Sequence, residues 1–310
     1  MGSFWKSNEV VPTWTAFISG WWSSSPPRLI MSNPMKREYG MMPGYTIRKA
    51  TQQDVLQIPN LWARFYSTSN SYRCVVPIEH IEKQIENLIW DVYVAVSDSM
   101  VVGTLVRRWI PGFFMGGARW GLAGVVDYYC VHPAYRKKGV GRNLLTYLHN
   151  ESGRPMPPHI MLWEGLQVTV PPLIAGVLYS KECFKSSLEA KLVSENKKEI
   201  WGSCVKGDCW SDVCAGIETD IWDIDGSYVV VTNTMHKTIP EGKSIGIVIA
   251  YSGSFENVNR FSQASGHDYG VLLHSSILPL AGWNYDSPFS WLGYNLQNSQ
   301  VQMRYPCLWY

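Results

Sequence analysis

A basic, glycine-bearing loop between an apolar strand and an apolar helix constrains the fold of this chain more than any other feature. Alternation and β-branched residues predict the strand over residues 125–131, closed by Pro133. The loop that follows reads Arg136-Lys137-Lys138-Gly139-Val140-Gly141-Arg142. Helical spacing of the next apolar residues then predicts an amphipathic helix, with Val140, Leu144, Leu145 and Leu148 on one face.

This loop is typical of a site for a pyrophosphate. The unpaired N–H groups at a helix N-terminus, together with the helix dipole, attract anions. Gly139 and Gly141 allow the backbone to approach a ligand closely, and Arg136, Lys137, Lys138 and Arg142 add positive charge. A dinucleotide-binding fingerprint would need a third glycine, which the loop lacks. A plain strand-to-helix turn with solvated basic side chains is the structural alternative.

The segments before the loop predict a mixed α/β domain. A strand is expected over 45–48, followed by a helix that starts at Thr51 and reaches Phe65, with Pro59 as a kink. The remaining expectations are a helix over 78–89, a hairpin made of 92–96 and 100–106, and a loop around Gly112, Gly116 and Gly117.

The second half of the chain echoes this order. Expected first are a strand over 160–163, a short helix that carries Tyr179 and a strand within 188–193. A further set then begins, with strands over 228–232, 245–250 and 271–273 and a helix over 257–264. We therefore predict an N-terminal arm over 1–43, a first domain over 44–195 and a second, divergent half over 196–310.

Composition excludes several functional classes. A formal net charge of +2 on 310 residues argues against a nucleic-acid surface. The uncharged stretch 10–27 is too rich in Pro, Gly and Ser for a transmembrane helix, and the start lacks a secretory signal, so we expect a cytoplasmic protein. Cys204, Cys209 and Cys214 do not have the spacing of a zinc site; reduced thiols and no metal are expected.

These features together resemble the GNAT superfamily of CoA-dependent acyltransferases. The Arg136-x-x-Gly139-x-Gly141 loop is similar to the loop with which that superfamily grips the CoA pyrophosphate. The run from Ala175 to Phe184 resembles its late helix, where a tyrosine protonates the leaving thiolate. The resemblance covers residues 45 to about 195. It implies acyl-CoA as cosubstrate, held by Cys130, Val131 and residues 136–142.

A tandem-GNAT family, the glycylpeptide N-tetradecanoyltransferases, is similar in further short motifs. These are the Phe4-Trp5 and Val11-Pro12 opening, the run Tyr129-Cys130-Val131-His132 and Tyr294-Asn295. This resemblance implies two GNAT-like halves in an α/β (α+β mixed) fold, with a mostly antiparallel central sheet flanked by helices. It also implies that the α-carboxylate of Tyr310 is a base. The Gly139-Val140-Gly141 loop is more similar to that of ordinary acetyltransferases.

Acyl transfer to an amine needs a polarised carbonyl, a base and an acid. We expect the backbone N–H groups of Tyr128, Tyr129 and Cys130 to polarise the thioester carbonyl at the end of the strand. Asp127 is a candidate base. Tyr179 is the candidate acid that the resemblance implies, with an ordinary core tyrosine as the alternative.

Three functions stay open. The first is N-acylation of a peptide or protein N-terminus, such as a glycine, with long acyl chains among the donors to consider. The second is N-acetylation of a small amine or lysine. The third is a non-catalytic GNAT-like interaction protein, which the complete phosphate loop argues against because a scaffold does not need one.

Overall fold

The computed structural model describes residues 28–29, 35–66, 71–115, 118–153, 156–164, 174–194, 200, 219–276, 278–294 and 296–297. The chain forms two compact units. The first comprises residues 1–174 and 290–301, and the second comprises 175–289 and 302–310. The first boundary thus follows residue 174, earlier than the predicted one after 195. Of the predicted arm, residues 1–27 and 30–34 lie outside the described part of the chain.

The first unit begins with a strand and a broken helix. After a two-residue strand, β1 (Arg28–Leu29), come β2 (Thr46–Lys49), α3 (Gln52–Val55) and α4 (Ile58–Phe65). The single helix predicted from Thr51 to Phe65 is therefore two helices. Pro59 lies in the first turn of α4, where its missing N–H group costs no hydrogen bond. The predicted start is confirmed, because the backbone N–H of Thr51 donates to Asp54 Oδ2 at 2.7 Å.

Long antiparallel strands form the centre of this unit. After β3 (Tyr72–Cys74) and α5 (Ile78–Glu86) come β4 (Trp90–Ser97), β5 (Met100–Met115) and β6 (Ala118–Val131). The β4–β5 hairpin is confirmed, with Asp98 and Ser99 at positive φ in the turn. The predicted loop at Gly112 is wrong, because β5 and β6 stay paired as far as Met115 and Ala118 and this ladder outweighs the low strand propensity of glycine.

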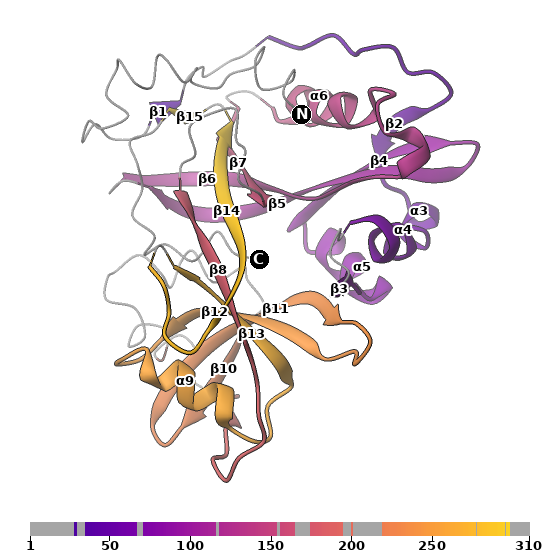
Figure 1. The fold of residues 1–310 in the computed structure, drawn as a ribbon. Helices are drawn as coiled ribbons and strands as arrows, with labels where there is room; N and C mark the ends of the chain where they lie inside the picture. Colours follow the sequence, from indigo (N-terminus) through magenta and orange to yellow (C-terminus); the bar gives the residue numbers. More distant parts are fainter. Residues whose placement is uncertain are drawn as a thin grey trace. The chain divides into compact units, whose positions relative to one another are not determined.

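A helix and a parallel strand complete the first unit. A 3₁₀ turn (Pro133–Tyr135) leads into α6 (Val140–Glu151), and β7 (His159–Glu164) then pairs with β6 in parallel. The strand order is β2-β4-β5-β6-β7. Helices α3, α4 and α5 lie on one side of these strands and α6 lies on the other (Figure 1).

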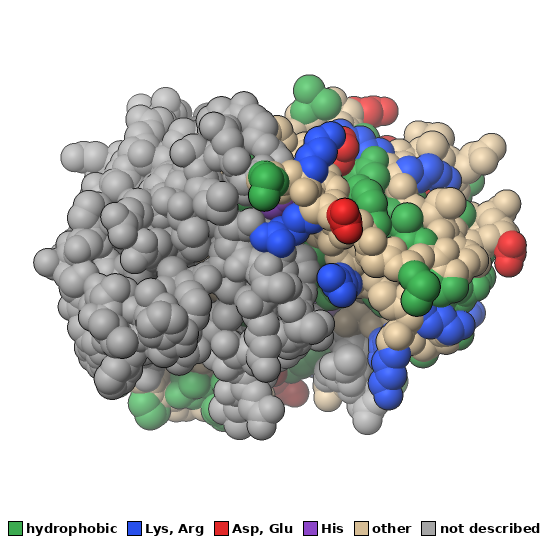
Figure 2. Space-filling view, turned by 90° about the horizontal axis from the view of Figure 1, so that it is seen from above, with side chains coloured by type: hydrophobic (Ala, Val, Ile, Leu, Met, Phe, Trp, Pro, Cys, Tyr) green, Lys and Arg blue, Asp and Glu red, His purple; other side chains and the backbone are tan. Residues whose placement is uncertain are grey.

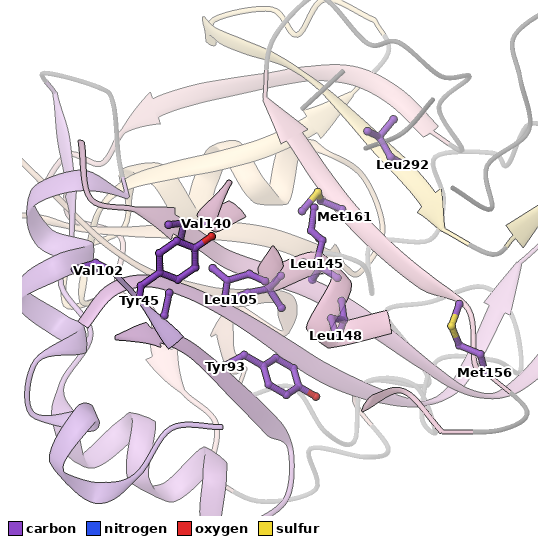
Figure 3. Close-up of a cluster of buried hydrophobic side chains, with 13 residues drawn as sticks. Tyr45, Tyr93, Val102, Leu105, Val140, Leu145, Leu148, Met156, Met161 and Leu292 are labelled. Carbon is purple, nitrogen blue, oxygen red and sulfur yellow. The ribbon is translucent and has the colours of Figure 1, made fainter. Parts of the chain in front are cut away.

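The core of the first unit lies between α6 and the sheet. Figure 3 shows this cluster, in which Val140, Leu145 and Leu148 of α6 pack with Val102 and Leu105 of β5. Tyr93 and Leu144 are fully buried there. Burial of side chains of this size stabilises the fold by about 1.5–3 kcal/mol each. The amphipathic helix predicted after the loop is therefore confirmed.

The second unit is built mainly from six strands and one described helix. Its strand order is β8-β13-β12-β11-β10-β9. These strands are β8 (Ile174–Glu182), β9 (Lys191–Leu192), β10 (Asp220–Ile224), β11 (Ser227–Thr238), β12 (Ser244–Tyr251) and β13 (Tyr269–Ser276). Helix α9 (Glu256–Gln263) joins β12 to β13, which pair in parallel. Strands predicted at 228–232, 245–250 and 271–273 and the helix at 257–264 are confirmed.

The last described strands return to the first unit. Strand β14 (Asn284–Tyr294) begins in the second unit and ends in the first, since residues 290–301 cluster with the first unit. Leu292 of β14 accordingly belongs to the core beside α6. Strand β15 (Leu296–Gln297) pairs with β1. The mixed α/β fold with a mostly antiparallel sheet is therefore confirmed.

Candidate functional site

A bulge in β6 distinguishes the end of this strand from the rest of the sheet. Thr104 of β5 pairs with Cys130, and Val106 pairs with Asp127, so that Leu105 alone faces both Tyr128 and Tyr129. Tyr128 has φ 45°, a left-handed conformation that is rare for a tyrosine. Because one strand carries an extra residue here, the regular ladder is interrupted at this point.

The bulge also breaks the alternation of side chains. Val126 packs in the core beside α6, and Tyr129 also reaches α6. Asp127 and Tyr128 both lie on the opposite face, where they contact residues of α4. Two consecutive side chains thus face the α4 side of the sheet. Without the bulge, alternation would direct one of them to the other face.

Tyr128 is fixed by aromatic and polar contacts. Its ring stacks on Trp62 with centroids 4.1 Å apart, and the rings of Tyr66 and Trp90 lie at 5.2 and 5.3 Å. Trp62 Nε1 donates to Thr104 Oγ1 at 2.8 Å, and this hydroxyl donates to the carbonyl oxygen of Tyr128 at 2.9 Å. These contacts hold a backbone conformation that otherwise costs about 1–3 kcal/mol.

Asp127 lies at the same bulge and accepts two hydrogen bonds on one oxygen. Oδ1 takes the hydroxyl of Tyr66 at 2.8 Å and the backbone N–H of Tyr128 at 2.7 Å. The Tyr128 amide, expected as a donor to a thioester carbonyl, is therefore engaged by the neighbouring carboxylate. Of the three expected donors, the amides of Tyr129 and Cys130 stay candidates.

The predicted phosphate loop forms the start of α6. Lys137 and Gly139 have φ 62° and 82°, and Gly139 is the N-cap residue of the helix. Glycine takes this left-handed conformation at no steric cost. No side chain caps α6, so the first-turn N–H groups have no partner from a capping residue. This is the arrangement in which a helix start binds an anion.

Basic side chains surround this helix start. Arg136, Lys137, Lys138 and Arg142 are all exposed. Figure 2, which views the molecule from the side on which α6 lies in Figure 1, shows Lys and Arg side chains among the described residues of this face. Hydrogen bonds fix the loop beneath them, since the Tyr45 hydroxyl donates to the carbonyl of Lys138 at 3.3 Å and accepts from Asn143 at 2.9 Å.

Tyr129 connects the bulge to the loop. Its hydroxyl lies only 2.0 Å from the position that a Cβ atom on Gly141 would occupy. Gly141 is therefore required for close packing against this ring, in addition to any role in binding a ligand. Burial raises the pKa of the Tyr129 phenol, so the hydroxyl keeps its proton and can act as a donor.

The cysteines of the site are buried thiols. Burial raises the pKa of Cys130 to about 12 and raises that of Cys74 as well. A thiol with such a pKa is protonated at neutral pH and is a weak nucleophile. Neither of these two cysteines is therefore activated to receive an acyl group, which favours direct transfer between the two substrates.

Tyr179 does not lie on a helix, and this prediction is wrong. It belongs to strand β8 of the second unit, opposite His274 of β13. With 8% of its surface exposed, it packs in the core of that unit. The apolar run from Ala175 to Tyr179 satisfies the strand pattern as well as the helical one, and pairing with β13 decides between them. Its role as an acid loses the support of the expected helix.

Two further predictions fall outside the described residues. These are the carboxylate of Tyr310 and the cysteines 204, 209 and 214. Among the residues that the structure describes, no three His, Cys, Asp or Glu side chains gather as metal ligands. None of the described helices is long and apolar enough to span a bilayer.

Sequence reasoning missed Tyr66, Trp62 and Thr104 as residues of the site. Trp62 falls inside the helix predicted from Thr51 to Phe65 without any further signal, and Tyr66 is 61 positions away from its partner Asp127. Only the pairing of β5 with β6, and the packing of α4 on both, brings these residues together. A local pattern in the sequence carries no signal for such a contact.

The part of the chain that contains the bulge and the loop matches a known protein family. Residues 58–153 match the profile of the acetyltransferase (GNAT) family. This segment runs from α4 through the bulge and the loop to the end of α6. It is therefore a GNAT domain, as the loop predicted. No curated protein sequence matches the chain.

Solved structures extend the likeness to the whole chain. Saccharomyces cerevisiae N-myristoyltransferase with bound myristoyl-CoA has a TM-score of 0.67 at 7% identity, over 96% of this chain and 93% of that one. A second structure of that yeast enzyme gives 0.66 at 8% identity, over 96% and 88%. A candidate acetyltransferase from Pyrococcus horikoshii gives 0.53 at 12%, over 88% and 96%. At these identities the likeness establishes the fold, which is that of the two-part yeast enzyme.

Proposed function

We propose that this chain, which carries a GNAT domain, transfers an acyl group from acyl-CoA to an amine. One observation carries the proposal: the uncapped start of α6, with its exposed basic loop, lies directly beside the bulge of β6. The first feature suits a pyrophosphate and the second suits a thioester carbonyl. Tyr129 links the two, since its backbone belongs to the bulge and its hydroxyl contacts Gly141.

The loop would hold the cosubstrate through its backbone and its charges. The pyrophosphate would accept from the N–H groups at 139–142, while Arg136, Lys138 and Arg142 supply positive charge. Cys130 and Val131, at the end of β6, would line the path of the pantetheine arm, as the resemblance to GNAT proteins implies. Charge-assisted hydrogen bonds of this kind are about twice as strong as neutral ones.

The chemistry requires no covalent enzyme intermediate. The lone pair of the amine forms the new C–N bond at the thioester carbonyl carbon. The C–S bond then breaks, and CoA leaves as a thiolate that takes a proton from solvent or an acid. The amine gives up its proton to a base, for which Asp127 is the candidate. The amides of Tyr129 and Cys130 would stabilise the oxyanion, each by about 3 kcal/mol.

For the acceptor we propose a peptide or protein N-terminus such as glycine, with a long-chain acyl-CoA as donor. The extent of the likeness to the yeast enzyme supports this proposal, since it covers 96% of this chain. A small amine or lysine with acetyl-CoA is the second candidate, favoured by the Gly139-Val140-Gly141 loop. The free, buried thiols of Cys74 and Cys130 suit a cytoplasmic setting.

Mass spectrometry of the products tests the proposal. The protein is incubated with acetyl-CoA or myristoyl-CoA and with a peptide that starts with glycine, a lysine peptide or a small amine. The expected product is the glycine peptide carrying the acyl group on its α-nitrogen, with release of free CoA. Acetylated small amine alone would favour the second candidate. Absence of any acylated acceptor, with intact acyl-CoA, would support a non-catalytic role.

A further inference from the structure

Asp127 is a half-buried carboxylate that has no basic partner among the residues that the structure describes. Two aspartates among the described residues of this unit do form ion pairs. Asp54 pairs with Arg48, and Asp91 pairs with Arg107 at 2.7 Å. No Lys, Arg or His among the described residues pairs with Asp127, although its side chain is only partly exposed. A carboxylate in such a position is stabilised by a positive partner.

The hydrogen bonds of Asp127 leave one of its oxygens available. Both donors, the Tyr66 hydroxyl and the Tyr128 amide, bind Oδ1. Oδ2 accepts no hydrogen bond from the described residues. Because Tyr66 directly follows α4 and Tyr128 belongs to β6, the carboxylate is held from two parts of the fold. It therefore presents its second oxygen in a fixed position, with little freedom left to lose when a ligand binds.

Aromatic rings pack around the bulge that carries this carboxylate. Tyr66 and Tyr128 lie 5.2 Å apart between ring centroids, and Trp62 and Trp90 pack on Tyr128 at 4.1 and 5.3 Å. Trp62, Trp90 and Tyr128 are buried, so these rings fix the position of the bulge and keep water from its inner side. A less polar surrounding strengthens the attraction between opposite charges.

We propose that Asp127, Tyr66 and Tyr128 form a recognition site for the ammonium form of the acceptor. Tyr66 is a positioning residue, which keeps Oδ2 directed to the ligand by occupying Oδ1. The site distinguishes a cationic N-terminus or alkylamine from an uncharged or acidic acceptor. This inference rests on the proposed function, because it identifies the class of amine that the transferase accepts.

A purely structural role for Tyr66 would consist in tying α4 to β6. Removal of its hydroxyl would then lower thermal stability without changing the choice of ligand. Tyr147 provides a matched control, since its phenol is also partly buried in this unit and its ring packs beside those of Tyr39 and Tyr93. Tyr66→Phe and Tyr147→Phe remove the same atom.

Three forms of one peptide that starts with glycine serve as probes. The free amine is the acceptor, the N,N-dimethylated form keeps the charge but gives no stable amide, and the N-acetylated form is neutral. We expect calorimetry on the acyl-CoA-bound protein to show that the dimethylated peptide binds at least about tenfold more tightly than the acetylated one, the size expected for one charge-assisted contact. Tyr66→Phe should reduce this preference to about threefold or less, and Tyr147→Phe should keep it.

Kinetics add a second readout. Tyr66→Phe should raise the KM of the free-amine peptide about tenfold and change kcat by less than about threefold, because the charge of the acceptor is recognised before reaction. Equal binding of the charged and neutral peptides by the wild type would overturn the inference, as would an unchanged preference and KM in Tyr66→Phe. Failure of the wild type to transfer any acyl group would contradict the proposed function instead, and the binding experiment would still decide the inference.

Discussion

The two units of this molecule contain the same local topology and differ in the loop that matters for chemistry. Each has one parallel strand pair among its described ladders, joined by a helix: β6–α6–β7 in the first unit and β12–α9–β13 in the second. Helix α6 starts at Gly139 in the left-handed conformation and follows a basic loop. Helix α9 follows Phe255 in the right-handed conformation and has Glu256 in its first turn.

This difference shows where function is encoded. A negative charge in the first turn of α9 occupies the end of the helix at which an anion would bind, whereas α6 has no acidic residue there. The β–α–β topology is thus shared, but only the first unit has a helix start suited to a phosphate. The fold provides the position, and the loop sequence provides the chemistry.

The largest expected effect is a loss of stability at acid pH, caused by one buried histidine in each parallel strand pair. Burial lowers the pKa of His159 in β7 to about 3 and that of His274 in β13 to about 4, both below the ordinary value of 6.5. As the pH falls below 6.5, the unfolded chain takes up protons that the folded chain does not, so stability decreases. Each histidine should cost up to about 2 kcal/mol between pH 6.5 and 5.

Urea unfolding at pH 7 and pH 5 measures this effect. His159→Gln and His274→Gln should each remove part of the loss between the two pH values, and the double variant should remove most of it. If only one variant flattens the pH dependence, the two units differ in their buried histidines as well as in their loops. An unchanged pH dependence in the double variant would contradict the assignment.

The contact between Tyr129 and Gly141 should give the next largest effect. A Cβ at Gly141 would overlap the Tyr129 hydroxyl, so Gly141→Ala should destabilise the protein by about 1–3 kcal/mol. In the second unit, Gly253 lies before α9 with φ 71°, and the Asn257 Nδ2 atom lies 3.1 Å from the position that its Cβ would occupy, a contact that a small shift relieves. Gly253→Ala should therefore cost only about 1 kcal/mol, mainly from backbone strain.

A second substitution separates overlap from strain. Tyr129→Leu removes the overlapping atoms, so Gly141→Ala in that background should cost less than about half of its effect in the wild type. Thermal unfolding of the four proteins gives this coupling. Additive effects of the two substitutions would show that Tyr129 is not what requires a glycine at 141.

These contacts also show how far the sequence can predict the fold. The loop 136–142, the hairpin around 98–99 and helix α9 follow from local patterns of apolar residues, glycines and turn residues, and the structure confirms them. Tyr179 was misassigned because its segment fits either a helix or a strand, and only pairing with β13 decides. Local patterns fail where a neighbouring strand determines the structure.

The site was predictable only in part, because some of its residues are brought together by strand register and helix packing. Its phosphate loop is a continuous segment, so its residues were identified together. The bulge that directs Asp127 and Tyr128 to one face depends on the register with β5, and Tyr66 reaches Asp127 only through the packing of α4. In that geometry the Tyr128 N–H donates to Asp127 Oδ1. The candidate donors to an oxyanion are therefore the amides of Tyr129 and Cys130.

Tyr179→Phe should give the smallest effect. Its side chain lies in the core of the second unit, and we expect kcat for acyl transfer to change by less than about twofold. Steady-state kinetics with saturating acyl-CoA measure this value. A fall in kcat of about a hundredfold, with acyl-CoA affinity retained, would return Tyr179 to the role of general acid and give the second unit a part in the chemistry.

The central claim is that one loop, in the first unit, binds acyl-CoA, and calorimetry tests it most directly. Titration of the wild type with myristoyl-CoA and with acetyl-CoA should give one site per chain. Lys138→Glu combined with Arg142→Glu should weaken binding about a hundredfold, since two charged contacts of about 1.4 kcal/mol each are lost. The matched pair Lys185→Glu and Lys191→Glu, exposed in the second unit, should leave the affinity unchanged. Equal affinity of the loop variant and the wild type, or loss of binding in the second-unit variant, would contradict the account.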